Sequence, residues 1–139
     1  MKTIIAGPRT CEDYEIVLKA IEKSGFEITE VVSGNANGID KLGERYAQEN
    51  KLKLKLFPAD WNNLKQKGAV IATNKWGKKY NKNSGFFRNE EMRDYADALI
   101  AINIGDTPGT GHMIKIAKEK GLKVFVYEED NAEDFGYEF

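Results

Sequence analysis

The chain has 139 residues, with 21 Lys and Arg against 22 Asp and Glu and a formal net charge of −1 at pH 7. This length suits one domain that can bury a core without help from a metal or a disulfide. A nearly balanced charge provides no bulk field for duplex DNA or for an anionic membrane. Any anionic ligand must therefore be bound by a local cluster of groups.

Cysteine content and hydropathy restrict the setting further. Cys11 is the only cysteine, which excludes an internal disulfide and a cysteine-based metal cluster and suits a reducing cytosol. The N-terminal apolar run is too short for a signal peptide, and no later stretch approaches the length of a membrane span. We therefore expect a cytoplasmic protein that contacts no membrane.

Strand and helix signals alternate along the chain. Apolar runs predict strands at 3–6, 28–33, 52–57, 98–104 and 122–127, and helical spacing or helix-start signals predict helices after residues 13, 38, 89 and 107. This alternation predicts an α/β fold: a single Rossmann-like domain over 1–139, with a doubly wound parallel sheet of about five strands in the order 3-2-1-4-5 and helices on both faces. The acidic tail 128–139 is expected on the surface.

One segment, at about 62–84, departs from this pattern. It is rich in lysine and asparagine and has only a brief apolar patch at 69–72. We expect a long insertion without regular structure, apart from a short helix at its start. Loops of this length in compact domains are usually functional or disordered.

Glycine-containing turns follow several of the predicted strands, at 7–10, 34–38 and 105–111. Glycines let the backbone come close to a ligand, and free N–H groups at a helix start attract anions, so such turns favour phosphate. The alternative is that glycine serves turn geometry alone. In the predicted strand order the winding reverses between strands one and four, which brings the turns at 7–10 and 105–111 into one crevice.

Arg88 is the strongest candidate for contacting a phosphate. It stands beside Asn89, a predicted helix cap, and a guanidinium can donate two parallel hydrogen bonds to a phosphate. A surface salt bridge with Glu91 or Asp94 is the alternative. Arg9, in the first strand-to-helix turn, is a second candidate of the same kind.

Several other side chains have both a binding and a structural interpretation. Thr107 and Thr110 can donate hydroxyl groups to phosphate or cap a helix. Asp40 can accept ribose hydroxyls or stabilise a helix start, and Trp61 can stack on a purine or pack in the core. His112, the only histidine, favours a structural role over a metal or catalytic one. The predicted ligand-binding residues are Gly7, Arg9, Ser33, Gly34, Asn35, Asp40, Trp61, Arg88, Asn89, Thr107, Gly109, Thr110 and Gly111.

Motifs spread over nearly the whole chain match one family in order. They are Gly7-Pro8-Arg9 with Asp13-Tyr14, Ser33-Gly34-x-Ala36-x-Gly38-x-Asp40 with Gly43-Glu44-Arg45-Tyr46-Ala47, Phe57-Pro58-Ala59-Asp60-Trp61, Gly85-x-x-Arg88-Asn89-x-x-Met92, Tyr95-Ala96-Asp97-Ala98 and Pro108-Gly109-Thr110-x-His112-Met113-Ile114. This set resembles the YspA-like branch of the SLOG superfamily. The resemblance implies a Rossmann-like fold that binds nucleotides or nucleotide-derived molecules. Relatives include "lonely guy" phosphoribohydrolases, molybdenum-cofactor carriers and SLOG domains that sense ADP-ribose-type signals in bacterial immunity.

Two departures from the family pattern bear on activity. The phosphoribohydrolases carry a catalytic glutamate three positions after the threonine of the glycine turn, where this chain has Met113. A thioether cannot relay a proton. The second departure is the insertion at 62–84, where the branch has a shorter link.

The first hypothesis for function is therefore a binding module that holds ADP-ribose, cyclic ADP-ribose or a similar signalling nucleotide as a sensor or a sequestering sink. If the source is a phage, a counter-defence sponge is expected. The alternative is a nucleotide-processing enzyme, such as an N-glycosidic or phosphoribosyl hydrolase, with Asp40 or His112 as the acid or base; the sequence does not decide the catalytic residue. No cofactor or metal is expected. The net charge disfavours a nucleic acid as a partner, and the remaining alternative is a DNA end that contacts the lysine-rich insertion. The family resemblance suggests a homo-oligomer in a bacterial cytosol or a phage-infected cell.

Overall fold

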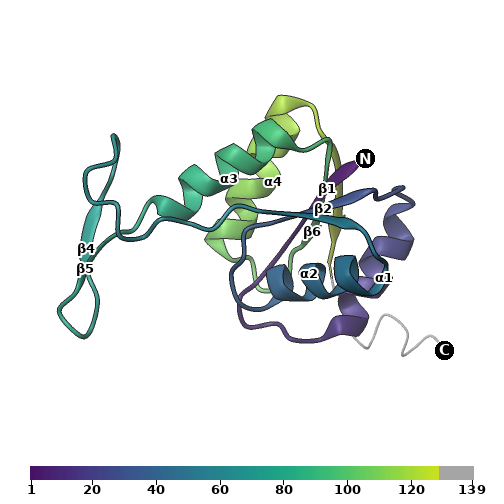
Figure 1. Ribbon diagram of the computed structural model, residues 1–139, viewed down its shortest axis with the longest axis horizontal. Coiled ribbons are helices and arrows are strands. Elements are labelled where there is room, and N and C mark those ends of the chain that lie inside the picture. The colour runs from purple at the N-terminus through teal and green to yellow at the C-terminus, as the bar shows by residue number, and fades with distance from the viewer. Residues whose placement is uncertain (129–139) are drawn as a thin grey trace.

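Five strands form the central sheet of the computed structural model, which describes residues 1–128 (Figure 1). They are β1 (Lys2–Ala6), β2 (Glu30–Ser33), β3 (Lys53–Leu56), β6 (Ala98–Ile102) and β7 (Lys123–Tyr127), in the order β3-β2-β1-β6-β7. Every neighbouring pair in this sheet is parallel. The predicted α/β class is confirmed. The numbering differs from the expected 3-2-1-4-5 because two further strands lie between β3 and β6.

Two helices cover each face of the sheet (Figure 1). They are α1 (Tyr14–Ser24) and α2 (Ile39–Glu49) on one face, and α3 (Ser84–Tyr95) and α4 (Pro108–Lys120) on the other. Side chains alternate along a strand, so Ile4 and Ile5 of β1 enter opposite core layers. All five residues of β6 are buried, as a central strand covered on both faces requires. None of the helices within residues 1–128 is long and apolar enough to cross a membrane.

The first helix begins and ends where its sequence signals indicate. Asp13 caps α1 by accepting a hydrogen bond from the backbone N–H of Glu15 at 3.0 Å. Gly25 ends the helix in the left-handed conformation, with φ of 69°, which glycine adopts without a Cβ penalty. The helix that apolar spacing predicts after residue 13 is confirmed.

Helix α3 corrects one prediction. It begins at Ser84 after the cap position of Asn83, so Asn89 lies inside the helix and is not its cap. The buried stripe of α3 contains Ser84, Arg88 and Met92, spaced four residues apart. Because two of these three side chains are polar, the stripe lacks the apolar periodicity that identifies a helix in a sequence.

The insertion also differs from its prediction. No helix forms within 62–83; instead, β4 (Ile71–Thr73) and β5 (Lys79–Asn81) pair antiparallel in a hairpin that projects from the body (Figure 1). Its organising residue is the fully buried Asn81. The Asn81 carboxamide accepts from the N–H groups of Val70 and Asn83 and donates to the carbonyl of Asn63 and to Gln66 Oε1. A polar centre of this kind leaves no hydrophobic signature in the sequence.

The two ends of the insertion are joined to each other by hydrogen bonds. The backbone N–H of Asn81 donates to the carbonyl of Trp61 at 2.7 Å. The Ser84 hydroxyl donates to the carbonyl of Asp60, also at 2.7 Å. The hairpin therefore leaves the body and returns to it at one place, directly before α3. The predicted surface tail lies outside the described residues from 129 onward.

Candidate functional site

A cavity of about 390 Å³ opens at the carboxyl ends of β1 and β6, where the winding of the sheet reverses. This is the position at which doubly wound folds bind ligands. We call this cavity the crevice. Its lining residues are Ala6, Gly7, Pro8, Arg9, Thr10, Ala36, Asp40, Trp61, Lys82, Gly85, Phe86, Arg88, Asn89, Met92, Thr107, Pro108, Gly109, Thr110 and Met113.

The crevice brings most of the predicted binding residues together. Those that line it are Gly7, Arg9, Asp40, Trp61, Arg88, Asn89, Thr107, Gly109 and Thr110. The predicted residues that do not line it are Ser33, Gly34, Asn35 and Gly111. The hydrogen bonds of these four residues indicate structural roles.

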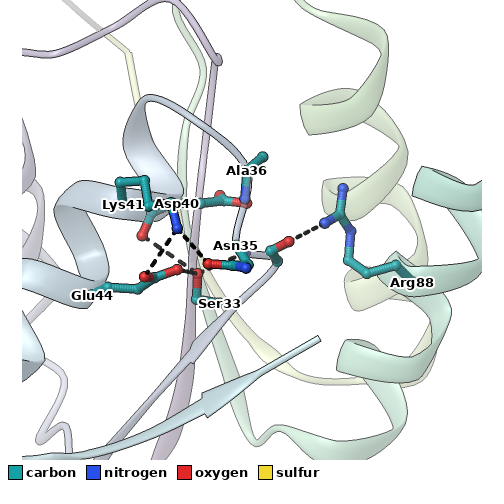
Figure 2. A network of polar contacts seen from close by, with 8 residues as sticks. Ser33, Asn35, Ala36, Asp40, Lys41, Glu44 and Arg88 are labelled. Carbon is teal, nitrogen blue, oxygen red and sulfur yellow. Dashed lines mark hydrogen bonds and ion pairs between the residues drawn. The ribbon is translucent and has the colours of Figure 1, made fainter. Parts of the chain in front are cut away.

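The turn after β2 is held by a polar network (Figure 2). The Ser33 hydroxyl donates to Glu44 Oε2 at 2.7 Å and accepts from the N–H of Asn35 at 3.0 Å. The Asn35 carboxamide oxygen accepts from Lys41 Nζ at 2.6 Å. These side chains therefore shape the turn and direct their polar groups away from the crevice. Gly111 lies within α4, where its N–H donates to the carbonyl of Thr107.

Arg88 is buried, with 8% of its surface exposed. Figure 2 shows it reaching from α3 to the turn after β2, where Nη1 donates to the carbonyl of Gly34. Its Nε donates to Asn89 Oδ1 at 3.1 Å. Nη2 has no hydrogen-bond partner within residues 1–128, and the side chain lines the crevice. Burial lowers the pKa of Arg88 from its ordinary value, but guanidinium groups stay charged in proteins.

The alternative interpretation of Arg88, a surface salt bridge, is not what the structure contains. Asp94 instead pairs with Arg93 at 2.9 Å and with Lys120 at 3.2 Å. Within the described residues Arg88 forms no ion pair with Glu91. The guanidinium is therefore held by neutral oxygens and forms no ion pair within the described residues, although the nearby carboxyl group of Asp40 interacts with its charge.

Asp40 is a buried carboxyl group in the first turn of α2, with 7% of its surface exposed. Its Oδ2 accepts from the N–H of Ala36 at 3.1 Å. Desolvation raises the pKa of Asp40 to about 6, although the Ala36 hydrogen bond and the charge of Arg88 act in the opposite direction. A Cβ at Gly34 would lie 2.8 Å from Asp40 Oδ2 and closer still to Nη1 of Arg88. Gly34 is thus needed for the approach of these two groups.

The N-terminus of α4 closes the crevice on the other side. Thr107 occupies the cap position, but its hydroxyl makes no capping bond and donates to Thr110 Oγ1 at 2.9 Å. Pro108 has no N–H, and Gly111 is the first residue of the helix whose N–H bonds back to Thr107. The N–H groups of Gly109 and Thr110 belong to the turn that every helix leaves without internal partners. They carry the positive end of the helix dipole into the lining of the crevice.

Asn89 links the two helices beside the crevice. Its Nδ2 donates to the carbonyl of Gly109 at 3.2 Å and lies 3.2 Å from His112 Nδ1. The ring of Phe86 packs on His112 with centroids 4.6 Å apart. Burial lowers the pKa of His112, and its ring does not line the crevice. His112 therefore positions α3 against α4. Within residues 1–128, no three His, Cys, Asp or Glu side chains gather closely enough to hold a metal ion.

Aromatic and apolar side chains make up the remaining walls. The guanidinium of Arg9 lies 5.2 Å from the ring centroid of Trp61, which makes an edge contact with Tyr80 at 6.4 Å. Trp61 is half-buried at the mouth and belongs to neither core layer. Sequence reasoning missed the lining residues Ala6, Pro8, Thr10, Ala36, Lys82, Gly85, Phe86, Met92, Pro108 and Met113. Most of them are members of the quoted motifs, namely Pro8, Ala36, Gly85, Met92, Pro108 and Met113, which is the signal that could have found them.

Comparison with known proteins bears on the first part of the chain and on the fold. The model of the YspA, cpYpsA-related SLOG family matches residues 1–63. The resemblance to the SLOG family is confirmed over this segment. The segment holds the turns after β1 and β2 and reaches Trp61. The SLOG match does not extend to Arg88 or to the N-terminus of α4, whose place in the crevice rests on the structure.

Two individual proteins are similar over longer stretches. The Gene 61 protein of Mycobacterium phage D29 is 29% identical over 133 residues, which cover 88% of this chain and 93% of that protein. The solved structure of DNA processing protein A (DprA) from Streptococcus pneumoniae superposes with a TM-score of 0.66 at 19% identity. That match covers 98% of this chain and 53% of the DprA chain, so this protein spans about half the length of DprA. At this identity the likeness shows a shared fold alone.

Proposed function

We propose that the crevice binds a small molecule derived from a nucleotide. The observation that carries this proposal is the buried guanidinium of Arg88, whose Nη2 is unused within residues 1–128, in the same cavity as the N-terminus of α4. A fixed cation and a helix N-terminus that line one cavity are the two commonest devices for holding phosphate. A cavity of about 390 Å³ lies within the usual range for small-molecule sites.

Each part of such a ligand has a matching part of the crevice. The N–H groups of Gly109 and Thr110 and the free edge of Arg88 would hold the phosphate. Asp40 would accept ribose hydroxyls, since at neutral pH a carboxyl group with a pKa of about 6 is mainly ionised. Trp61 offers a ring face at the mouth on which a base can stack.

We infer that binding, without chemical conversion, is the function. Met113 lines the crevice and is 1% exposed, and it occupies the position where the related phosphoribohydrolases carry a catalytic glutamate. A thioether supplies neither a proton nor a charge for cleavage of a glycosidic bond. ADP-ribose, cyclic ADP-ribose or a similar signalling nucleotide is the proposed ligand. The similarity to a phage protein favours a cytosolic sink that sequesters an immune signal.

A thermal-shift screen followed by chromatography tests this proposal. The panel is AMP, ADP-ribose, cyclic ADP-ribose, NAD and cyclic dinucleotides. A ligand present at one hundred times its dissociation constant adds about 2.7 kcal/mol of stability, which raises Tm by several degrees. The ligand should be recovered intact. If no member of the panel shifts the Tm, the proposal is wrong.

A matched pair of variants assigns the shift to the crevice. Arg88→Lys keeps a charge but loses the planar fork, and should weaken binding about tenfold or more. Arg93→Lys makes the same change on the same helix, at a residue that pairs with Asp94 at the surface, and should leave affinity unchanged. Equal affinities in the two variants would remove Arg88 from the binding site.

A nucleotide-processing enzyme is the second candidate, and the state of Asp40 favours it. A general acid or base works best with a pKa near the working pH, and burial has raised that of Asp40 to about 6. Release of ribose 5-phosphate from AMP, lost in Asp40→Asn, would establish this reading. Recovery of intact AMP with the wild-type protein would exclude it for that substrate.

A further inference from the structure

A second cavity adjoins the crevice. It measures about 460 Å³ and lies between the hairpin and the turn after β1. We call it the hairpin cleft; its lining residues are Arg9, Trp61, Asn62, Asn74, Lys78, Tyr80 and Lys82. Arg9, Trp61 and Lys82 line both cavities. A ligand that passes Trp61 can therefore occupy both.

The strand β5 gives the hairpin cleft one of its walls. Side chains alternate between the two faces of a strand. Tyr80 within β5 and the two lysines that flank it, Lys78 and Lys82, all line the cleft. Lys79, exposed on the same strand, does not. Asn81 points the other way, into the buried polar centre of the insertion. The hydrogen bonds of Asn81 thus fix which face of β5 is turned to the cleft.

The charges of the cleft have one sign. Its lining holds three cationic side chains, Arg9, Lys78 and Lys82, and no carboxylate. This concentration is local, since the whole chain has a net charge of −1. Cations grouped beside aromatic rings match a ligand that carries both a phosphate and a base, because each base can stack on an aromatic face.

We propose that the hairpin cleft is a second subsite, which takes the second phosphorylated nucleoside of a dinucleotide whose first nucleoside occupies the crevice. This inference rests on the proposed function of the crevice. The cavities are similar in volume, and each falls in the range of a small-molecule site. Trp61 stands between them, where it contacts Arg9 on one side and Tyr80 on another. The insertion thereby sets the length of ligand that the protein selects.

Isothermal titration with AMP and with the linear dinucleotide pApA tests the second subsite. The wild-type protein should bind pApA at least tenfold more tightly than AMP. Lys78→Gln should weaken pApA binding about fivefold, the loss expected for one exposed charge contact, and leave AMP unaffected. Lys79→Gln removes the same charge from the neighbouring residue of β5 and should change neither affinity. Binding of pApA without detectable AMP binding would also support the subsite.

The remaining outcomes separate this inference from the proposed function. Equal affinities for AMP and pApA, or a Lys78→Gln variant that behaves like Lys79→Gln, would overturn the second subsite and leave the crevice in place. Failure of the wild-type protein to bind either probe would count against the crevice itself and remove the inference with it. Affinity that rises further from pApA to an eight-residue oligoadenylate, and falls with Lys78→Gln, would overturn the dinucleotide in favour of a single-stranded nucleic acid.

Discussion

Replacing Asp40 by asparagine should stabilise the protein at neutral pH. Asp40 is buried beside the turn after β2, where its Oδ2 accepts one backbone hydrogen bond, from Ala36. An asparagine side chain has nearly the same shape, and its carboxamide oxygen can accept the same bond. What the substitution removes is the cost of holding a carboxylate away from water.

The size and sign of this effect follow from the pKa. Burial raises the pKa of Asp40 from its ordinary value of 3.8 to about 6. Between these values the native state retains the proton and the unfolded state releases it, so the stability contributed by Asp40 falls as pH rises from about 4 to about 6. At about 1.4 kcal/mol per pKa unit, the ionised group costs on the order of 3 kcal/mol above pH 6. Asp40→Asn recovers this amount at pH 7.5 and almost none near pH 4.

Urea unfolding at pH 4, 5, 6 and 7.5 measures the difference. The free energy of unfolding of Asp40→Asn minus that of the wild type should grow with pH and level off above pH 6. Asp106→Asn makes the same change at an exposed position and should follow the wild type throughout. A difference for Asp40→Asn that does not change with pH, or that is negative at pH 7.5, would refute the reasoning.

Three further predictions concern the glycines, the tryptophans and the insertion. Gly34→Ala should lower the free energy of unfolding by about 1–3 kcal/mol, because its Cβ meets buried polar atoms, whereas Gly111→Ala, with open space around its Cβ, should raise it by about 0.5–1 kcal/mol. Trp76 is 79% exposed at the hairpin. Binding of ADP-ribose should alter tryptophan fluorescence in the Trp76→Phe variant, which keeps Trp61, but not in the Trp61→Phe variant, which keeps Trp76. Asn81→Leu should remove hydrogen-exchange protection from 69–83 and leave that of the sheet unchanged.

A specific result would contradict each of these three predictions. Urea titrations that show Gly34→Ala as stable as Gly111→Ala would mean that the turn after β2 can relax without loss. A fluorescence change that disappears with Trp76 and survives without Trp61 would place the ligand at the tip of the hairpin. Loss of hydrogen-exchange protection throughout the Asn81→Leu variant, measured by mass spectrometry, would show that the hairpin and the sheet unfold as one unit.

The main sheet could be predicted because its signals are local. The strands β1 and β6 are short apolar runs that end at glycine-containing turns, and the cap residues Asp13 and Gly25 mark the first helix. The rule that ligand sites lie at the carboxyl ends of parallel strands then placed Arg9 and Thr110 together correctly. These inferences need no knowledge of long-range packing.

The predictions that were wrong, for the insertion, the start of α3 and the turn after β2, share a cause: they depend on polar contacts that the sequence does not show. Asn81 and Ser84 are polar residues buried by hydrogen bonds to distant parts of the chain, so the hairpin and the true start of α3 carry no apolar pattern. The side chains of Ser33 and Asn35 bond to Glu44 and Lys41 of α2, and sequence does not reveal whether a polar side chain bonds to a neighbouring element or faces a cavity. In each case the position of the hydrogen-bond partner in the folded structure decides the outcome.

The joined ends of the insertion make this part of the fold separable from the rest. Because Trp61 and Asn81 are hydrogen-bonded to each other and Ser84 bonds to Asp60, a replacement of any length would begin and end at the same two points. Longer surface segments cost little additional loop-closure entropy. The insertion could therefore be replaced without moving the parallel sheet or the N-terminus of α4, and such a replacement would change the cleft beside the crevice.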